Sequence, residues 1–299
     1  MKKIGYIGLG KMGGTISEII LASGYQVFGY DPDNIACNKF KKRGGSVLSS
    51  PKEVAKKSDI VLASLPNDDI VREAIFGSNG VSKINKKLIF ADISTVYPEI
   101  TKEISRTLKK QSISYLDATV SGNPKVAKRK ELVLMCGGTK NSFNACLPIF
   151  RTFTKKQFYM GPSGSGSLMK MVVNTISEIN RTAIGEGFSL GKKGGLKGET
   201  MLEVLKEGAA YSKQMDLKGD RILHSNYSSP ESTIQQCIKT ANQILKTANE
   251  LDHPIPMTAL RTQLYQAVAS MGHVNDDSSS IAELFNKMSG IKLKKGAKS

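Results

Sequence analysis

Lys170 and Asn174 are the residues of this chain whose types and spacing could most directly do chemistry. They lie four positions apart at the end of the segment GPSGSGSLMKMVVN, residues 161–174. On a helix this spacing places both side chains on one face, one turn apart. A lysine among apolar helical residues is costly to bury, so it either extends to solvent or has a function. The glycines before it would let a ligand or another backbone segment approach the start of the helix closely.

A glycine-rich turn near the N-terminus is the first element expected to position such chemistry. A short apolar run, residues 2–7, leads into a predicted helix over residues 11–23 through the turn Gly8-Leu9-Gly10-Lys11-Met12-Gly13. The pattern G-x-G-x-x-G between a strand and a helix is the fingerprint of dinucleotide binding. Its first glycine makes a tight turn, its second lets the backbone approach a pyrophosphate, and its third permits close packing of helix on strand. The N-terminus of the helix would then face the phosphates.

Asp31 follows a second predicted strand, residues 25–30, and lies about 20 residues beyond the glycines, as dinucleotide-binding folds require. A carboxylate at this position can accept hydrogen bonds from both hydroxyls of the adenosine ribose, and it would repel a 2′-phosphate. The sequence therefore favours NAD over NADP as the cofactor. Lys39, Lys41 and Lys42 lie not far downstream and keep NADP possible.

Strand and helix patterns alternate from the N-terminus to about residue 160. The apolar, β-branched run DIVLASL, residues 59–65, predicts a buried parallel strand that ends at Leu65-Pro66. Further strands are expected over residues 87–93, 113–117, 131–136 and 157–160, with helices between them. Such alternation is typical of an α/β protein with a doubly wound sheet, here of about seven or eight strands.

Only helical patterns follow the glycines at residues 161–166. The helix that carries Lys170 is expected to run to about residue 193, and further helices over residues 198–209, 231–251, 256–271 and 276–288. We therefore predict an NAD(P)-binding Rossmann domain over residues 1–162, a connecting helix over residues 163–193, and an all-helical substrate and dimerisation domain over residues 194–299. Long amphipathic helices with few partners inside so small a domain predict a homodimer or a homotetramer.

The chain is strongly basic, with 43 lysines and arginines against 26 acids and a formal net charge of +17. Such a field attracts anions, including nucleotides and small carboxylates. The basic residues form short scattered clusters, which are typical of a solvated surface. We therefore expect a small carboxylate as the substrate and do not favour a nucleic-acid partner.

Cysteine usage and hydropathy limit the class of protein further. The four cysteines are scattered, without a C-x-x-C pair or a histidine cluster, so we expect reduced thiols and no metal site. The sequence contains no run of 18 apolar residues, so we expect no membrane span. The N-terminal segment MKKIGYIGLG is too short and too rich in glycine for the apolar region of a signal peptide. These features predict a cytoplasmic protein.

Taken together, these motifs resemble the β-hydroxyacid dehydrogenase family, which includes 3-hydroxyisobutyrate dehydrogenase and tartronate semialdehyde reductase. The similarity spans nearly the whole chain. It rests on the glycine turn at residues 8–13, Leu65-Pro66, Asp92-x-Ser94-Thr95, Asp117-Ala118-Thr119-Val120-Ser121-Gly122, Gly137-Gly138 and Gly164-x-Gly166-x-x-x-Lys170-x-x-x-Asn174. The resemblance implies an enzyme that oxidises a 3-hydroxy acid to a semialdehyde with NAD(P), or runs the reverse reaction.

The resemblance also implies a role for each matching residue. Lys170 corresponds to the catalytic lysine of the family, and Asn174 would hold the substrate one turn away. The substrate carboxylate would be bound by the Ser121 hydroxyl and by the amides of Gly122 and Asn123. The residues expected to contact the cofactor, beyond the glycine turn and Asp31, are Leu65, Pro66, Thr95 and, from the helical domain, Lys239.

The chain departs from the family pattern at three positions. Asn123 stands where the family often has a second glycine, and Lys130 replaces a glycine before the strand at residues 131–136. Thr240 replaces the acid that usually follows the late lysine. These departures concern the identity of the substrate more than the chemistry.

Other interpretations stay open at this point. A decarboxylating 6-phosphogluconate dehydrogenase would need a histidine and an acid where this chain has Val173 and Ser177, and Glu178 is out of register. Imine reductases resemble the fold but commonly lack the lysine, and a glyoxylate or succinic semialdehyde reductase of the same superfamily is a further alternative. A non-catalytic relative that binds nucleic acid is compatible with the charge, but it leaves the lysine, the asparagine and Ser121 unexplained.

Overall fold

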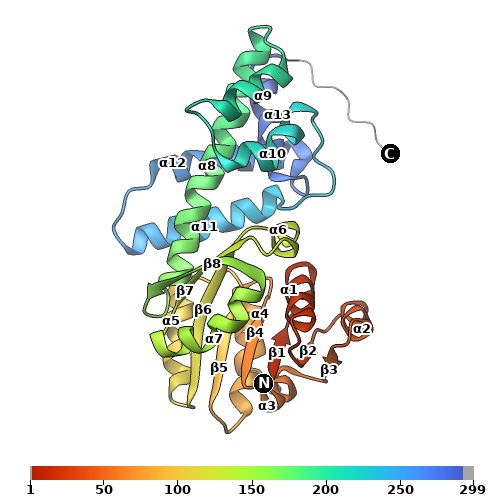
Figure 1. The fold of residues 1–299 in the computed structure, drawn as a ribbon. Helices are drawn as coiled ribbons and strands as arrows, with labels where there is room; N and C mark the ends of the chain where they lie inside the picture. The colour runs from red at the N-terminus through yellow and green to blue at the C-terminus, as the bar shows by residue number, and fades with distance from the viewer. Residues whose placement is uncertain (1, 292–299) are drawn as a thin grey trace. The chain divides into compact units, whose positions relative to one another are not determined.

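The structure is a computed structural model that describes residues 2–291 (Figure 1). The described residues form two compact units, which divide between Lys170 and Met171. The first unit contains a β-sheet with helices, and the second is helical. The predicted fold class, a Rossmann domain followed by an all-helical domain, is therefore confirmed.

An eight-stranded sheet organises the first unit. Its strands are β1 (Ile4–Ile7), β2 (Val27–Tyr30), β3 (Ser46–Val47), β4 (Ile60–Ala63), β5 (Leu88–Asp92), β6 (Ile113–Ser121), β7 (Leu132–Gly137) and β8 (Thr154–Gly161). The spatial order is β3-β2-β1-β4-β5-β6-β7-β8, and all neighbouring pairs are parallel except β6 and β7. The first six strands have the order of a dinucleotide-binding fold, in which ligands lie at the carboxyl ends of the strands.

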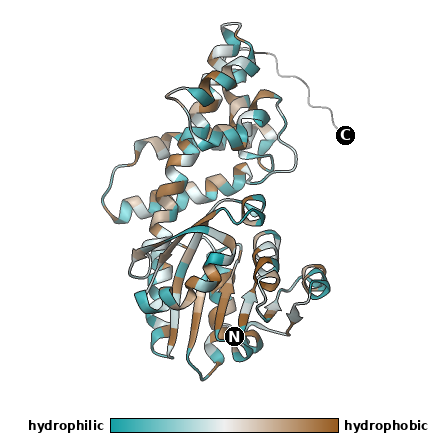
Figure 2. Ribbon diagram, viewed as in Figure 1, coloured by the Kyte–Doolittle hydropathy of each residue, from teal (hydrophilic) through white to brown (hydrophobic). Residues whose placement is uncertain are grey.

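Helices cover both faces of this sheet. They are α1 (Lys11–Ala22), α2 (Asn34–Lys42), α3 (Pro51–Lys57), α4 (Asp68–Phe76), α5 (Pro98–Lys109), α6 (Pro124–Lys128) and α7 (Lys140–Phe153). Side chains of α1, α2, α6 and α7 share one apolar core, and those of α3, α4 and α5 share another. Successive residues of a strand lie in different cores; Leu62, for example, lies in the first and Val61 in the second. Both faces of the central strands are therefore buried, and these strands are runs of apolar residues (Figure 2).

Strand β6 is longer than the sequence predicts. We expected a strand that ends at Asp117, but the structure continues it to Ser121. Residues 117–121 pair antiparallel with β7, from Gly137 opposite Asp117 to Val133 opposite Ser121. This pairing with a distant segment makes D-A-T-V-S a strand, although the segment has no clear periodicity of its own.

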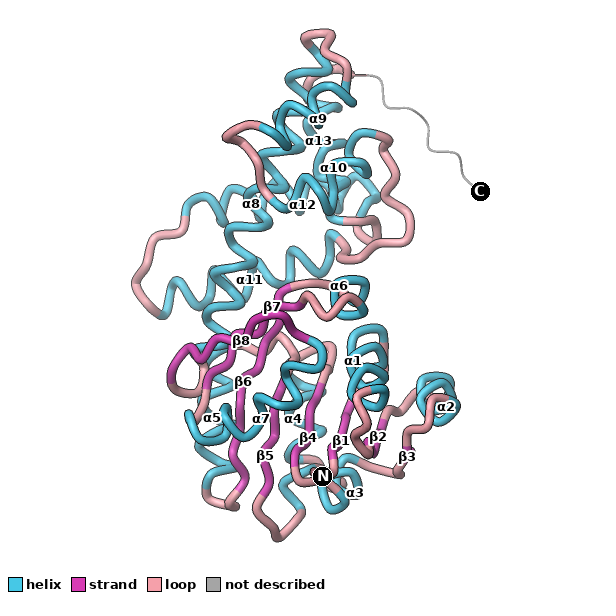
Figure 3. Tube along the Cα trace, in the orientation of Figure 1, coloured by secondary structure: helices cyan, strands magenta, loops and turns pink. Residues whose placement is uncertain are grey.

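The regular structure of the second unit is helical over the described residues (Figure 3). Helix α8 (Ser165–Lys193) begins in the first unit and continues into the second, followed by α9 (Gly198–Glu207), α10 (Lys213–Leu223), α11 (Ile234–Glu250), α12 (Pro256–Val268) and α13 (Ile281–Met288). The predicted long helix through Lys170 is confirmed. Helices α2, α6 and α10 were not predicted; in α10, Gly219 and charged residues conceal the buried stripe of Met215 and Ile222.

Two further expectations concern cysteines and membranes. All four cysteines are buried and free. Among residues 2–291, no helix combines the length and the apolar character that a membrane crossing requires.

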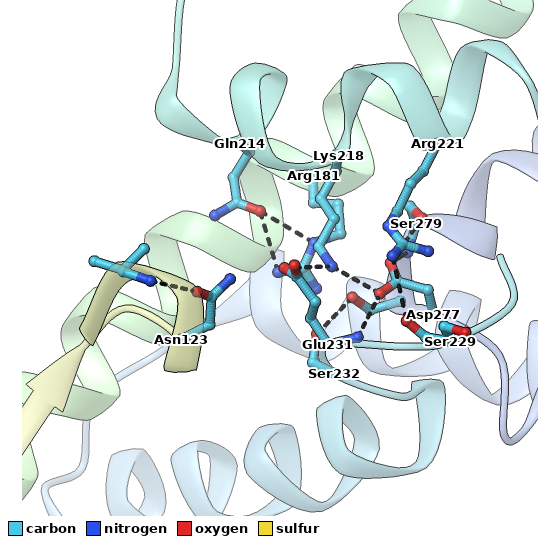
Figure 4. Close-up of polar contacts among 12 residues, drawn as sticks. Asn123, Arg181, Gln214, Lys218, Arg221, Ser229, Glu231, Ser232, Asp277 and Ser279 are labelled. Atoms are coloured by element: carbon cyan, nitrogen blue, oxygen red, sulfur yellow. Dashed lines mark hydrogen bonds and ion pairs between the residues drawn. The ribbon is translucent and has the colours of Figure 1, made fainter. Parts of the chain in front are cut away.

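A buried ion pair joins α10 to the turn before α13 (Figure 4). The Lys218 Nζ lies 2.7 Å from Asp277 Oδ2, and the two side chains are 4% and 0% exposed. Asp277 also accepts hydrogen bonds from the amides of Glu231 and Ser279. Burial alone would raise the pKa of Asp277, but the Lys218 ammonium and the Ser279 donors hold it below its ordinary value. Removing one partner would leave an uncompensated buried charge.

Candidate active site

The glycine turn has the geometry that a pyrophosphate site requires. Gly8 adopts a φ of +86°, and a Cβ on Gly13 would overlap the carbonyl oxygen of Gly8. A Cβ built on Gly10 meets no atom of residues 2–291 within 4 Å, so the space above this residue is open. Gly10 is also the N-cap of α1, and no side chain of the described residues caps that helix. The first-turn amides of α1 and the open space at Gly10 therefore fit an anionic phosphate group.

Asp31 is fixed at the carboxyl end of β2 beside this turn. Its Oδ2 accepts a 2.6 Å hydrogen bond from the amide of Leu9, and its Oδ1 accepts a 2.8 Å bond from the amide of Asp33. An ionised carboxylate has further lone pairs for hydroxyl donors, so Asp31 fits a ribose. A hollow of about 350 Å³ adjoins the turn, and its lining includes Asp33 and Lys39. The lining also includes Glu18 and Lys11, so two acids and two bases balance each other in this hollow.

A hydrogen-bond chain holds the loops after β4 and β5. The amide of Leu65 donates to Ser94 Oγ at 2.8 Å, and the amide of Ser94 donates to the buried Asp92 at 2.9 Å. Burial raises the pKa of Asp92. Pro66 is exposed and Thr95 is half-buried. Since β4 and β5 are adjacent parallel strands, these two residues lie at the same edge of the sheet as the glycine turn.

Asp117 and Thr119 dock the start of α8 against β6. The Asp117 carboxylate accepts hydrogen bonds from the amides of Gly164 at 3.0 Å and Ser167 at 2.9 Å. Burial raises the pKa of Asp117 to about 6. The Thr119 hydroxyl donates to the carbonyl oxygen of Gly166 at 3.0 Å, and a Cβ on Gly166 would overlap the Asp117 carbonyl oxygen. Gly166 therefore allows the close approach of another backbone, that of β6.

Lys170 lies in the second turn of α8, which this docking brings to the end of β6. Its Nζ donates a 2.8 Å hydrogen bond to the carbonyl oxygen of Val120. Burial lowers the pKa of Lys170 to about 8, although part of the side chain is still exposed. An amine with this pKa can both accept and donate a proton near neutral pH.

The turn after Val120 contains the residues predicted to bind the substrate carboxylate. Ser121 ends β6 half-buried, and Gly122 is exposed with a φ of +131°. A Cβ on Gly122 would come within 2.6 Å of Leu132, so this position requires glycine. The Asn123 side chain accepts a 3.0 Å hydrogen bond from the amide of Val126 and caps α6. The first unit therefore brings Lys170 together with the predicted carboxylate turn.

Asn174 and Lys239 belong to the second unit. Asn174 is half-buried on α8, one turn beyond Lys170, and Lys239 is exposed on α11. Glu178 is buried and forms an ion pair with Arg261 of α12. Glu178 is therefore part of the helical core. In the sequence it is also one position beyond the acid that a decarboxylating 6-phosphogluconate dehydrogenase would need.

Sequence reasoning assigned no role to Asp92, Asp117 or Thr119. All three are buried, at 1%, 2% and 0% exposure. The sequence contained a signal for the two aspartates, because each lies in an apolar strand segment. A buried acid needs hydrogen-bond or charge partners. Within residues 2–291, no group of three or more His, Cys, Asp or Glu side chains could hold a metal ion.

Two family models and several known proteins are similar to this chain. Residues 3–161 match the family model of the NAD binding domain of 6-phosphogluconate dehydrogenase, and residues 164–285 match that of the NAD-binding region of NADP-dependent 3-hydroxyisobutyrate dehydrogenase. The chain is 30% identical over 295 residues to 2-(hydroxymethyl)glutarate dehydrogenase of Eubacterium barkeri, covering 98% of each protein. It is 29% identical over 286 residues to mitochondrial 3-hydroxyisobutyrate dehydrogenase of Mus musculus, covering 93% of this chain and 85% of that protein.

A solved structure shows the same fold over nearly the whole length. The crystal structure of 3-hydroxyisobutyrate dehydrogenase from Salmonella typhimurium matches with a TM-score of 0.86 at 23% identity. The match covers 95% of this chain and 100% of that one. The two family models and the 30% identical relative show that the chain belongs to the β-hydroxyacid dehydrogenase family and is an NAD(P)-dependent oxidoreductase.

Proposed function

We propose that this enzyme interconverts a small 3-hydroxy acid and its semialdehyde, with Lys170 as the general acid and base. The observation that carries the proposal is the position of the Lys170 amine, 2.8 Å from the Val120 carbonyl oxygen and directly before Ser121. Its pKa, lowered to about 8 by burial, suits proton transfer in both directions.

The cofactor residues would hold NAD(P) at the carboxyl ends of the strands. The amides at the start of α1 would bind the pyrophosphate, and Asp31 would accept hydrogen bonds from the ribose hydroxyls. Leu65, Pro66 and Thr95 would border the nicotinamide, with Lys239 as a further contact. When bound, NAD(P) accepts the hydride in oxidation and supplies it in reduction. We infer a preference for NAD, because Asp31 would repel a 2′-phosphate.

The substrate residues would fix the acid and move one proton. Ser121 and the amides of Gly122 and Asn123 would bind the carboxylate, an anion that suits exposed amides in a glycine turn. In oxidation, neutral Lys170 takes the proton of the substrate hydroxyl as the C–H hydride departs. In reduction, the Lys170 ammonium polarises the carbonyl and returns that proton to the oxygen. Asn174 would hydrogen-bond the substrate and maintain its orientation.

The names of two relatives suggest a common substrate core. 3-Hydroxyisobutyrate and 2-(hydroxymethyl)glutarate both contain HOCH2–CH(R)–COO⁻, and they differ only in the group R. We infer that this enzyme also acts on such a primary alcohol. The carboxylate turn and Lys170 would bind the shared part, and residues beyond them would select R.

A substrate panel tests this proposal. Oxidation rates are measured with NAD and NADP for HOCH2–CH(R)–COO⁻ acids that carry hydrogen, methyl, hydroxyl or carboxyethyl as R. Reduction is measured for glyoxylate, succinic semialdehyde and a cyclic imine. The proposal expects the highest kcat/KM within the first series, and a cyclic imine as the best substrate would contradict it.

We also infer that the enzyme is a homodimer or a homotetramer. The second unit exposes large apolar side chains, with Leu190 at 75%, Val204 at 64% and Leu260 at 60% exposure. Exposed apolar surface of this kind is typical of subunit interfaces. Sedimentation at micromolar concentration should give at least twice the 32.4 kDa chain mass, and a monomer would contradict the inference.

A further inference from the structure

A hollow of about 960 Å³ lies at the amino ends of the sheet strands. Lys87 and Leu88 at the start of β5 line it, together with residues 112–115 at the start of β6. Its walls come from α5, from the first turns of α7, and from Pro162 and Ser163 before α8. The predicted cofactor residues follow the carboxyl ends of the parallel strands, so this hollow lies at the opposite end of the sheet.

The hollow exists because β7 covers only half of β6. The antiparallel ladder ends where Gly137 pairs with Asp117. Strand β5 pairs with β6 from Ile113 onward on the other side. Over the described residues, the first four residues of β6 therefore have a strand neighbour on one side only. The space that β7 would fill is left between α5 and α7.

Basic side chains dominate the charge of this hollow. Those that line it are Lys87, Lys102, Arg106 and Lys109, the last three from one face of α5. The lining contains one acid, Asp59, whose carboxylate accepts a hydrogen bond from the amide of Lys3. Four cations against one anion make the hollow attractive to anions.

Three of these cations form no ion pair within the described residues. Lys102 is paired with Glu99 at 2.5 Å. For Lys87, Arg106 and Lys109, no acid of residues 2–291 lies within ion-pair distance. Like charges around one hollow repel each other, and a multiply charged anion would relieve that repulsion.

Neutral donors complete the lining of the hollow. Hydroxyl groups come from Ser105, Ser112, Ser114, Thr139, Ser142 and Ser163. The 14-residue helix α7 begins at Lys140, between the lining residues Thr139 and Asn141; the Thr139 hydroxyl caps it by accepting a hydrogen bond from the amide of Ser142, which leaves the amides of Lys140 and Asn141 at the first turn. A helix N-terminus has a positive dipole end and favours phosphate. Cationic side chains, hydroxyls and a helix N-terminus together are the donor set that phosphate groups bind.

We propose that this hollow is a second ligand site, which binds a small polyanion with phosphate groups. Its three cations outside ion pairs provide charge complementarity, and the serines and α7 provide hydrogen bonds. The site is separate from the cofactor residues, since it lies at the other end of the sheet. It therefore binds its ligand while NAD(P) occupies the glycine turn.

Calorimetric titration of the full chain with inorganic pyrophosphate tests this site. The protein is first saturated with its preferred cofactor, so that the glycine turn is filled and cannot take the probe. The test variant carries Lys87→Gln, Arg106→Gln and Lys109→Gln. The matched control carries Arg151→Gln, Lys155→Gln and Lys156→Gln, which remove the same three charges from exposed positions of the first unit outside the hollow.

The expected result is saturable binding of pyrophosphate by the wild-type protein and by the control, with Kd values within about twofold of each other. The hollow variant should bind at least about tenfold more weakly, because its three cationic partners are lost. An unchanged kcat in both variants confirms that they are folded. No saturable binding to the wild-type holoenzyme at about 10 mM pyrophosphate would overturn the proposal. Equal weakening of pyrophosphate binding in both variants would also overturn the proposal. It would indicate that the anion is attracted by the net positive charge of the surface and not bound in the hollow.

Discussion

The Lys170 ammonium donates a 2.8 Å hydrogen bond to the carbonyl oxygen of Val120, the residue directly before Ser121. This bond joins the helix that carries the amine to the strand that ends in the predicted carboxylate turn. It also places the amine where burial lowers its pKa to about 8.

Replacing Lys170 should remove most of the activity. General acid–base catalysis contributes roughly 10²–10⁴-fold, so Lys170→Ala should lower kcat by at least about 10²-fold. Lys170→Arg should not restore it, because a guanidinium cannot release its proton near neutral pH. Steady-state kinetics on the best substrate measures both variants.

Cofactor binding provides the control for this experiment. The dissociation constant of NAD should stay nearly unchanged in Lys170→Ala, since the glycine turn and Asp31 would hold the cofactor. A variant that keeps more than about a tenth of wild-type kcat, with chemistry rate-limiting, would rule out the lysine mechanism.

The pH dependence should differ in sign between the two directions. The pKa of Lys170 is lowered from 10.5 to about 8, and oxidation needs the neutral amine. The oxidation rate should therefore rise with pH and level off above about pH 8, whereas the reduction rate should fall over the same range. Rate profiles at saturating cofactor show this ionisation, which should be absent from the residual activity of Lys170→Ala.

Gly166→Ala should disturb the position of Lys170 without touching the substrate. The added Cβ would overlap the Asp117 carbonyl oxygen and lie 2.8 Å from the Gly137 amide, and neither backbone can move cheaply. We expect α8 to shift and kcat to fall by about tenfold or more, as happens when a reacting group is misplaced by about 1 Å.

Gly187→Ala is the matched control on the same helix. Gly187 is exposed, and its Cβ would meet no atom of residues 2–291 within 4 Å. This variant should keep its kcat and gain roughly 0.5–1 kcal/mol of stability from helix propensity. Equal kcat values for the two glycine variants would show that close packing of α8 on β6 does not matter for catalysis.

Cofactor choice should depend on Asp31. Asp31→Ser removes the charge that would repel a 2′-phosphate and weakens the acceptor for ribose hydroxyls. The ratio of kcat/KM for NAD to that for NADP should exceed one in the wild-type enzyme and decrease by about tenfold or more in the variant. A wild-type preference for NADP would show that this carboxylate does not select the cofactor.

The buried pair in the second unit should make a large contribution to stability. Lys218→Met leaves the fully buried Asp277 without its cation, at a cost of about 3–5 kcal/mol. Lys206→Met is the control, because its partner Asp216 is 3.9 Å away and exposed, and such pairs contribute about 1 kcal/mol or less. Urea unfolding followed by circular dichroism measures both, and similar losses would contradict the assignment.

Local patterns were sufficient to predict that the glycine turn and Asp31 lie together. The turn at residues 8–13 and Asp31 form one strand–helix–strand unit, and their spacing in the chain fixes their spacing in space. The α/β fold class could also be predicted from the sequence. Parallel strands are buried on both faces of the sheet, so they occur in the sequence as apolar runs. Lys170 and Asn174 were also predicted as neighbours on one helix, since four residues make about one turn.

Tertiary structure decided how the lysine is held. The sequence does not show that Asp117 binds the amides at the start of α8, because this contact joins segments about 50 residues apart. It also does not show that β6 continues to Ser121, because that extension depends on pairing with β7. The lowered pKa of Lys170 follows from burial, which exists only after α8 packs on β6.

The hollow beside α5, at the other end of the sheet, could not be predicted from the sequence either. Lys87, Arg106 and Lys109 look like ordinary surface charges in the sequence, and periodicity cannot show that they surround one space. That space arises because β7 ends opposite Asp117, which is a matter of strand register. Sequence determines which residues can do chemistry here, but packing over long chain separations determines which of them meet, because contact and desolvation are properties of the assembled fold.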